Sequence, residues 1–129
     1  MLQEIACLHR ISLIILFGSK ALGKDSKNSD IDLGILFDEL PSDVEEEKVL
    51  DAFIHLFRTD RLDIVVLSYA SPLLLFQVAT KGKPIYENVF GSFFKFSIMA
   101  HKKYWESEKF RKLKKSFIDR EIRKLKLAK

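Results

Sequence analysis

The chain has 129 residues, of which 47% are hydrophobic and 31% charged, which is typical of one globular domain and not of a disordered chain. Its one cysteine excludes an intramolecular disulfide framework. No apolar run approaches the roughly 18 residues of a transmembrane helix, and the first ten residues lack the layout of a signal peptide. We therefore expect a cytoplasmic protein without a membrane partner. The net charge of +4 is unevenly spread, because residues 1–100 carry 10 Lys/Arg against 14 Asp/Glu and residues 101–129 carry 12 against 4.

Hydrophobic periodicity predicts alternating helices and strands before residue 90. Ser42 or Asp43 has the side chain of a helix N-cap, Pro72 suits the first position of a helix, and Gly82 suits a helix end. The elements expected in chain order are a helix over 2–10, a buried strand over 13–17, a loop over 18–29 with room for one helical turn, a strand over 31–37, a helix over 43–57, a strand over 62–67, a helix over 72–81 and an edge strand over 84–86.

From Ser92 the sequence is helical almost to its end. An unbroken helix over 92–126 would be about 52 Å long at 1.5 Å per residue, whereas a compact domain of this length is only about 36 Å across. The helix therefore either breaks or projects with an apolar face that needs a partner. The apolar positions on this face are Phe110, Leu113, Phe117, Ile118, Ile122 and Leu125.

We accordingly divide the chain into a core over residues 1–90 and a basic helical extension over 91–129. The extension belongs to the same domain or docks a partner. Its positive charge fits a solvated helix face or an acidic partner surface; contact with nucleic acid phosphates is the less favoured reading.

Candidate catalytic and binding residues are concentrated at and between the first two expected strands, where Gly18-Ser19 is followed after ten residues by Asp30-Ile31-Asp32. Strand side chains alternate, so Asp30 and Asp32 project from one face while Ile31 points into the core. Two neighbouring carboxylates repel each other, and a divalent cation relieves that repulsion. Mg²⁺ is usually held by one or two carboxylates together with substrate phosphates. The alternative is a pair of ordinary carboxylates that face solvent.

The same segment contains groups that can bind phosphate. Backbone N–H groups at Gly18 and Ser19 can form an anion-binding nest, and Lys20 adds positive charge in the same loop. A third carboxylate, Asp63, lies in an otherwise apolar strand. If the strands of Asp32 and Asp63 are neighbours in register, the carboxylates form a cluster suited to two-metal nucleotidyl transfer; otherwise Asp63 is a solvent-facing charge at a strand end.

The spacing Gly-Ser, ten residues, Asp-x-Asp resembles the nucleotidyltransferase superfamily related to polymerase β. The fuller string FGSKALGKDSKNSDIDLGIL is similar to the minimal nucleotidyltransferase (MNT) family, and the resemblance extends over residues 13–86. It implies an α/β fold, with a small mixed-sheet, palm-like core, flanking helices and a C-terminal helical extension. It also implies catalytic and metal-ligating roles, toward two Mg²⁺ ions, for Asp30, Asp32 and Asp63. Gly18 and Ser19 would bind the triphosphate of ATP, with Lys20 beside them where the family often has arginine.

Small MNT proteins commonly occur as antitoxins paired with HEPN-domain RNase toxins. The resemblance therefore implies that AMP is transferred from ATP to a hydroxyl group, that of a tyrosine, on a HEPN partner within a hetero-oligomer. The chain has no R-x4-H string, so it is not the toxin itself. Two alternatives stay open. One is a non-catalytic antitoxin that neutralises its partner by binding. The other is a small-molecule (antibiotic) adenylyltransferase, although such enzymes usually have a further substrate-binding domain.

Overall fold

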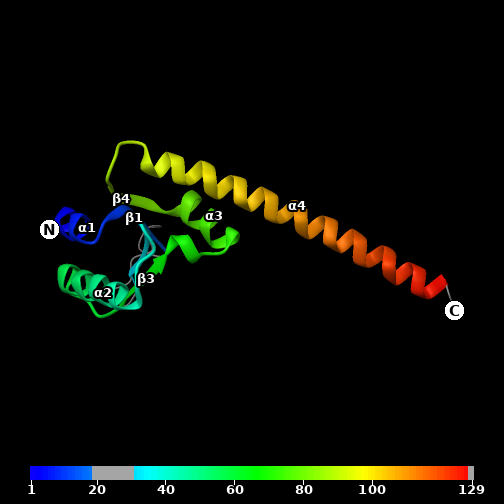
Figure 1. Cartoon of the computed structure of the whole chain (residues 1–129), viewed down its shortest axis with the longest axis horizontal. Coiled ribbons are helices and arrows are strands. Elements are labelled where there is room, and N and C mark those ends of the chain that lie inside the picture. Colours follow the sequence, from blue (N-terminus) through cyan, green and yellow to red (C-terminus); the bar gives the residue numbers. More distant parts are fainter. Residues whose placement is uncertain (19–30, 128–129) are drawn as a thin grey trace.

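A mixed sheet with helices against both faces forms the body of the protein in the computed structural model, which describes residues 1–18 and 31–127 (Figure 1). This arrangement confirms the α/β core with flanking helices that the sequence predicts. The elements are α1 (Leu2–Leu8), β1 (Ile11–Phe17), β2 (Ile31–Phe37), α2 (Asp43–Phe57), β3 (Leu62–Val66), the 3-10 helix η1 (Leu67–Tyr69), α3 (Pro72–Lys81), β4 (Lys83–Glu87) and α4 (Ser92–Leu127).

In the described residues the strands are ordered β3-β2-β1-β4. β1 pairs antiparallel with both β2 and β4, and β2 pairs parallel with β3. A parallel pair needs a crossover connection, and α2 supplies it. The sequence analysis made the carboxylate cluster conditional on the second and third strands being neighbours, and this condition is met. β3 and β4 are the two edge strands of the described sheet.

Each face of the sheet carries its own core, because successive side chains of a strand point to opposite faces. The cluster on the α1 and α2 side contains Ala6, Ile11, Ile14, Leu33, Ile35, Phe37, Val49, Phe53 and Leu62. The cluster on the α3 and α4 side contains Leu13, Ile15, Leu67, Leu75, Val78, Phe96 and Ala100. The sheet is thus fixed from both faces, which holds the ends of its strands in a defined register.

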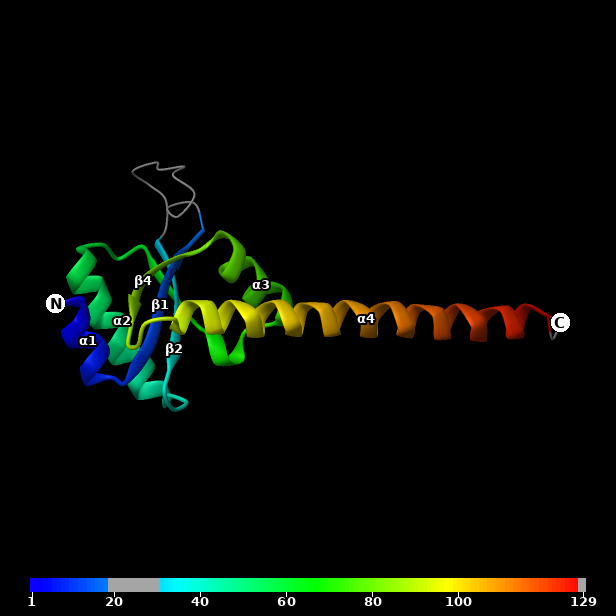
Figure 2. The same cartoon turned by 90° about the horizontal axis from the view of Figure 1, so that it is seen from above.

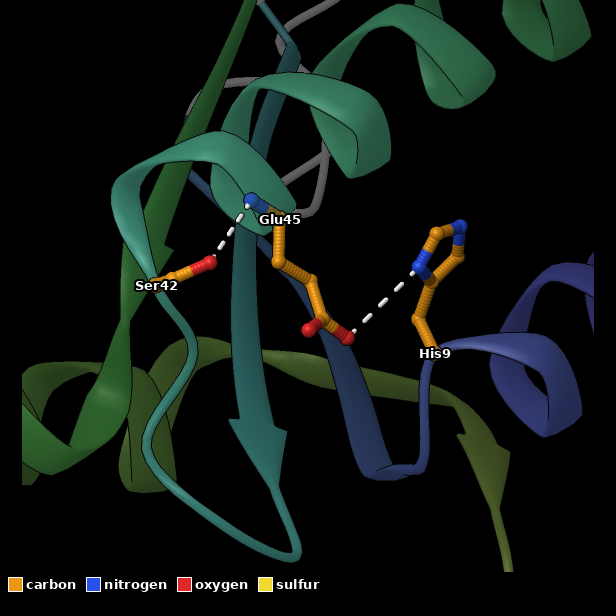
Figure 3. Close-up of polar contacts among 3 residues, drawn as sticks. All are labelled: His9, Ser42 and Glu45. Atoms are coloured by element: carbon orange, nitrogen blue, oxygen red, sulfur yellow. Dashed lines mark hydrogen bonds and ion pairs between the residues drawn. The ribbon is translucent and has the colours of Figure 1, made fainter.

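Side-chain caps set the helix starts where the sequence predicts them. The Ser42 hydroxyl accepts a hydrogen bond from the Glu45 N–H at 3.2 Å, and the Ser71 hydroxyl accepts one from the Leu74 N–H at 3.2 Å. Such caps stabilise a helix by about 1 kcal/mol each. The Glu45 carboxylate also lies 3.6 Å from His9 Nδ1, which links the end of α1 to the start of α2 (Figure 3).

Three strands and one helix differ in their bounds from the prediction. β4 covers Lys83–Glu87 rather than 84–86, and α1 ends at Leu8 rather than residue 10. β1 begins at Ile11 rather than residue 13, because Arg10 adopts a left-handed φ of 54° that turns the chain out of α1. Ile11 is then buried and pairs with Phe37. β3 ends at Val66 rather than residue 67, because Leu67 starts η1 and its side chain packs beneath Gly34.

Helix α4 is unbroken and projects from the body, as both views show (Figure 2). Its 36 residues span about 54 Å at 1.5 Å per residue. Phe96 and Ala100 bury its first turns against the sheet and α3, whereas every residue over 109–127 is exposed. Of the two outcomes that the length allowed, the structure shows the projecting helix. No helix over residues 1–18 and 31–127 is long and apolar enough to cross a membrane.

Candidate active site

Two of the predicted carboxylates lie side by side on adjacent strands. Asp32 of β2 and Asp63 of β3 are partners in the parallel register, and neighbouring strands are separated by about 4.8 Å. Residues paired in a parallel ladder direct their side chains to the same face of the sheet. The crossover through α2 therefore brings together two carboxylates that are 31 positions apart in the sequence.

Gly18 completes this group from the end of β1. Phe17 pairs with Asp32, so the next residue passes directly over the Asp32 side chain. Gly18 has a φ of +82°, and a Cβ atom built on it would lie 2.3 Å from the Asp32 Oδ2 oxygen. The φ favours glycine here, because an L side chain is strained at this value, and an added Cβ would also displace the Asp32 carboxylate. The backbone of Gly18 therefore lies directly against the Asp32 side chain.

The electrostatics of the pair suit a hard divalent cation. Asp63 is exposed and Asp32 is partly buried, so the two negative charges face a solvent-accessible edge of the sheet. No cluster of three or more His, Cys, Asp or Glu side chains able to hold a metal occurs within residues 1–18 and 31–127. Two carboxylates on one face nevertheless match the protein share of a Mg²⁺ site, in which phosphate oxygens and water supply the remaining ligands.

Several predicted site residues fall outside the described part of the chain. Ser19, Lys20 and Asp30 all lie within residues 19–30, as does the helical turn allowed for in the loop. Their roles stay predictions. The structure brings together Gly18, Asp32 and Asp63 and gives no geometry for the other three.

The structure also reveals acidic residues beside the site that the sequence analysis did not use. Asp43, Glu46 and Glu47 of α2 line a cavity of about 470 Å³ that also contacts Asp63. In the sequence, these carboxylates are typical of a solvent-exposed helix N-terminus, where negative charge interacts favourably with the helix dipole. Their position beside β3 follows only from the sheet order.

Comparison with known proteins agrees with this geometry. Residues 2–90 match the family model described as "Polymerase beta, Nucleotidyltransferase". The chain is 35% identical over 95 residues to the protein adenylyltransferase MntA of Aphanizomenon flos-aquae, a match covering 67% of this chain and 63% of the relative. It is 32% identical over 77 residues to the protein adenylyltransferase MntA of Shewanella oneidensis, covering 60% and 55%. The chain thus spans less than two thirds of the length of these curated relatives.

Solved structures share the fold over nearly the whole chain. One is a crystal structure of a toxin-antitoxin with AMP-PNP, with a TM-score of 0.75 and 24% identity, covering 94% of this chain and 95% of the other. Another holds a tri-AMPylated Shewanella oneidensis HEPN toxin in complex with MNT antitoxin, with a TM-score of 0.68 and 21% identity, covering 94% and 92%. Because 94% of this chain is covered, the shared fold includes most of the 36-residue helix α4.

Proposed function

The chain belongs to the polymerase beta nucleotidyltransferase family, and from this premise we propose that it transfers AMP from ATP to a tyrosine hydroxyl of a HEPN-domain toxin. By modifying the toxin it acts as the antitoxin of the pair. The observation that carries the proposal is the pairing of Asp32 with Asp63 in register, with Gly18 held against Asp32. Two curated relatives named protein adenylyltransferase support the same reaction.

In the proposed reaction the acceptor oxygen attacks the α-phosphorus of ATP. A new O–P bond forms, the bond between the α-phosphorus and the bridging oxygen breaks, and pyrophosphate leaves. Asp63 is more exposed than Asp32, and we assign it to the acceptor side, where it receives the hydroxyl proton or orients the water that does. Gly18, with Ser19 and Lys20, holds the triphosphate.

The carboxylates of Asp30, Asp32 and Asp63 would hold Mg²⁺ in this site. When bound, the metal neutralises charge on the phosphates and activates the acceptor oxygen. The chain's own contribution is the fixed position of Asp32 and Asp63, set by the parallel pairing of β2 and β3. A reaction that consumes ATP agrees with the cytoplasmic location that the sequence predicts.

We further propose that the projecting part of α4, residues 109–127, docks the partner protein, while residues 1–90 form the catalytic core. The exposed segment carries nine Lys/Arg against two Asp/Glu. Its apolar positions are far from buried, with Phe110 67% and Phe117 63% exposed, and unpartnered apolar stripes of this kind mark interaction sites. Two such positively charged helices repel each other, so a second copy is disfavoured and an acidic partner surface is favoured.

An assay of toxin neutralisation distinguishes an antitoxin that acts by catalysis from one that acts by binding alone. Asp32→Asn keeps the shape of the side chain and removes its charge, so the variant should still form the complex and fail to suppress the RNase activity of the toxin when ATP and Mg²⁺ are present. Complex formation is measured by size-exclusion chromatography, and RNase activity by cleavage of a labelled RNA. A variant that binds and still neutralises fully would contradict catalysis and favour an antitoxin that acts by covering its partner.

A further inference from the structure

The free edge of β3 forms the floor of a groove that starts at the active site. No strand pairs with β3 on its outer side in the described part of the chain. Two adjoining cavities of about 470 Å³ and 460 Å³ follow this edge and share Glu46, Ile64 and Val66. Helix α2 flanks the groove on one side, and Tyr69 and Leu74 flank it on the other. Asp63 lies at one end of the groove.

The backbone of this edge is arranged to accept another strand. The Arg61 carbonyl accepts a hydrogen bond from the Ile31 N–H at 2.9 Å, which fixes which groups of β3 point toward β2. Backbone groups alternate along a strand, so the N–H and C=O groups of Leu62, Ile64 and Val66 point to the open side. An extended peptide can pair with these groups, as in recognition by strand addition.

The charge of the groove selects among possible occupants. Asp43, Glu46 and Glu47 line its α2 side, and within residues 1–18 and 31–127 no Lys or Arg lines either cavity. If β3 of a second copy paired with this edge, the acidic flanks of the two copies would face each other, which like charges oppose. A basic extended segment has the complementary charge.

We propose that the acceptor segment of the partner protein binds as an extended, basic strand along the free edge of β3, with its hydroxyl-bearing residue at Asp63. This inference rests on the proposed function and adds how the protein substrate is recognised. The five residues of β3 extend about 17 Å at 3.3–3.4 Å per residue. The basic residues that contact Glu46 and Glu47 therefore lie within about five positions of the modified hydroxyl in the acceptor sequence.

Charge reversal on the groove tests the proposal. We would compare Glu46→Lys/Glu47→Lys with the control Glu4→Lys/Glu39→Lys, which changes net charge equally at two exposed carboxylates that line neither cavity. The assay follows AMP transfer from α-labelled ATP to the purified partner. The groove variant should raise the KM for the partner by roughly tenfold or more and leave the KM for ATP unchanged. The control should change neither constant.

Amide hydrogen exchange supplies a second readout that does not depend on turnover. Addition of the partner to the 129-residue chain should slow exchange over residues 62–66, whereas ATP and Mg²⁺ alone should not. Equal partner KM values for the two double variants, or protection that appears only outside β3, would overturn the inference. Protection of β3 that grows with the chain's own concentration in the absence of partner would overturn it as well, in favour of a second copy.

The two proposals fail in different ways. If the wild-type chain labels no acceptor under any condition, the proposed transferase function fails. If it labels the partner and the groove variant has the same partner KM as the control, only the recognition of an extended segment at β3 fails.

Discussion

A methyl group added at position 18 tests whether the end of β1 and the Asp32 carboxylate form one site. In Gly18→Ala the new Cβ would lie 2.3 Å from Asp32 Oδ2, whereas an ordinary contact begins at 3.4 Å. The carboxylate or the turn must therefore move by about 1 Å, the difference between these two distances. Displacement of a catalytic group by 1 Å can lower the rate by about a hundredfold.

The same substitution also strains the backbone. An alanine at the φ of +82° found for Gly18 costs about 1–2 kcal/mol, and each kcal/mol lowers the Tm of a domain of this size by roughly 3–5 °C. Gly91→Ala is the matched control, because Gly91 has a φ of +92° and nothing lies within 4 Å of its added Cβ. The control therefore carries the backbone strain without the collision.

We expect a loss of Tm in both variants, at least as large in Gly18→Ala because it adds the collision to the strain, and a loss of AMP transfer only in Gly18→Ala. Thermal melts measure the first quantity, and initial rates with labelled ATP at a temperature where both variants are folded measure the second. If Gly18→Ala transfers AMP at a rate within a few-fold of Gly91→Ala, then the close approach of Gly18 to Asp32 does not matter for the reaction and the site as described is wrong.

Three further predictions follow from exposure and charge. Asp63→Asn should lower kcat by roughly a hundredfold or more and change the free energy of unfolding by no more than about 0.5 kcal/mol, since Asp63 is exposed. In the control Asp60→Asn, at another exposed aspartate, neither kcat nor the free energy of unfolding from denaturant titration should change appreciably. Phe117→Glu should weaken partner binding by about tenfold in calorimetry, whereas Lys112→Gln, with the same change in net charge, should not. The pKa of Tyr86 is raised from 10.0 by burial and then by the neighbouring Cys7 and Asp38, so the folded state retains the phenol proton to higher pH than the unfolded state and stability falls as the pH rises above 10. Tyr86→Phe should reduce this fall, which is measured as the change in denaturant midpoint between pH 9 and pH 11. An equal fall in both proteins would contradict the assignment.

Local signals were sufficient to predict most of the secondary structure. The cap at Ser42 and the helix end at Gly82 lie where their side-chain chemistry predicts, because each depends on interactions within one turn of helix. The continuous α4 is also local, since residues 92–127 contain neither proline nor glycine. Its projection follows from the mismatch between its length and the width of the domain.

Tertiary relations limited what the sequence could predict of the site. The neighbourhood of Asp32 and Asp63 was an expectation conditional on strand order, and the parallel pairing of β2 with β3 fulfils it. The sequence associated Gly18 with phosphate, and its collision distance to Asp32 appears only when β1 and β2 are paired. The acidic groove is similarly invisible in the sequence, because Glu46 borders β3 only if β3 is an edge strand.

The most direct test of the central claim is to follow the two ends of the triphosphate separately. The chain and Mg²⁺ are incubated with the proposed HEPN partner in purified form. ATP is labelled in the α-phosphate or, in parallel, in the γ-phosphate, and Asp32→Ala/Asp63→Ala is the inactive control. Label from the α-phosphate should appear on a tyrosine of the partner, and label from the γ-phosphate should appear only in pyrophosphate. Transfer of γ-label to protein, or α-label that persists in the double variant, would contradict nucleotidyl transfer by this site.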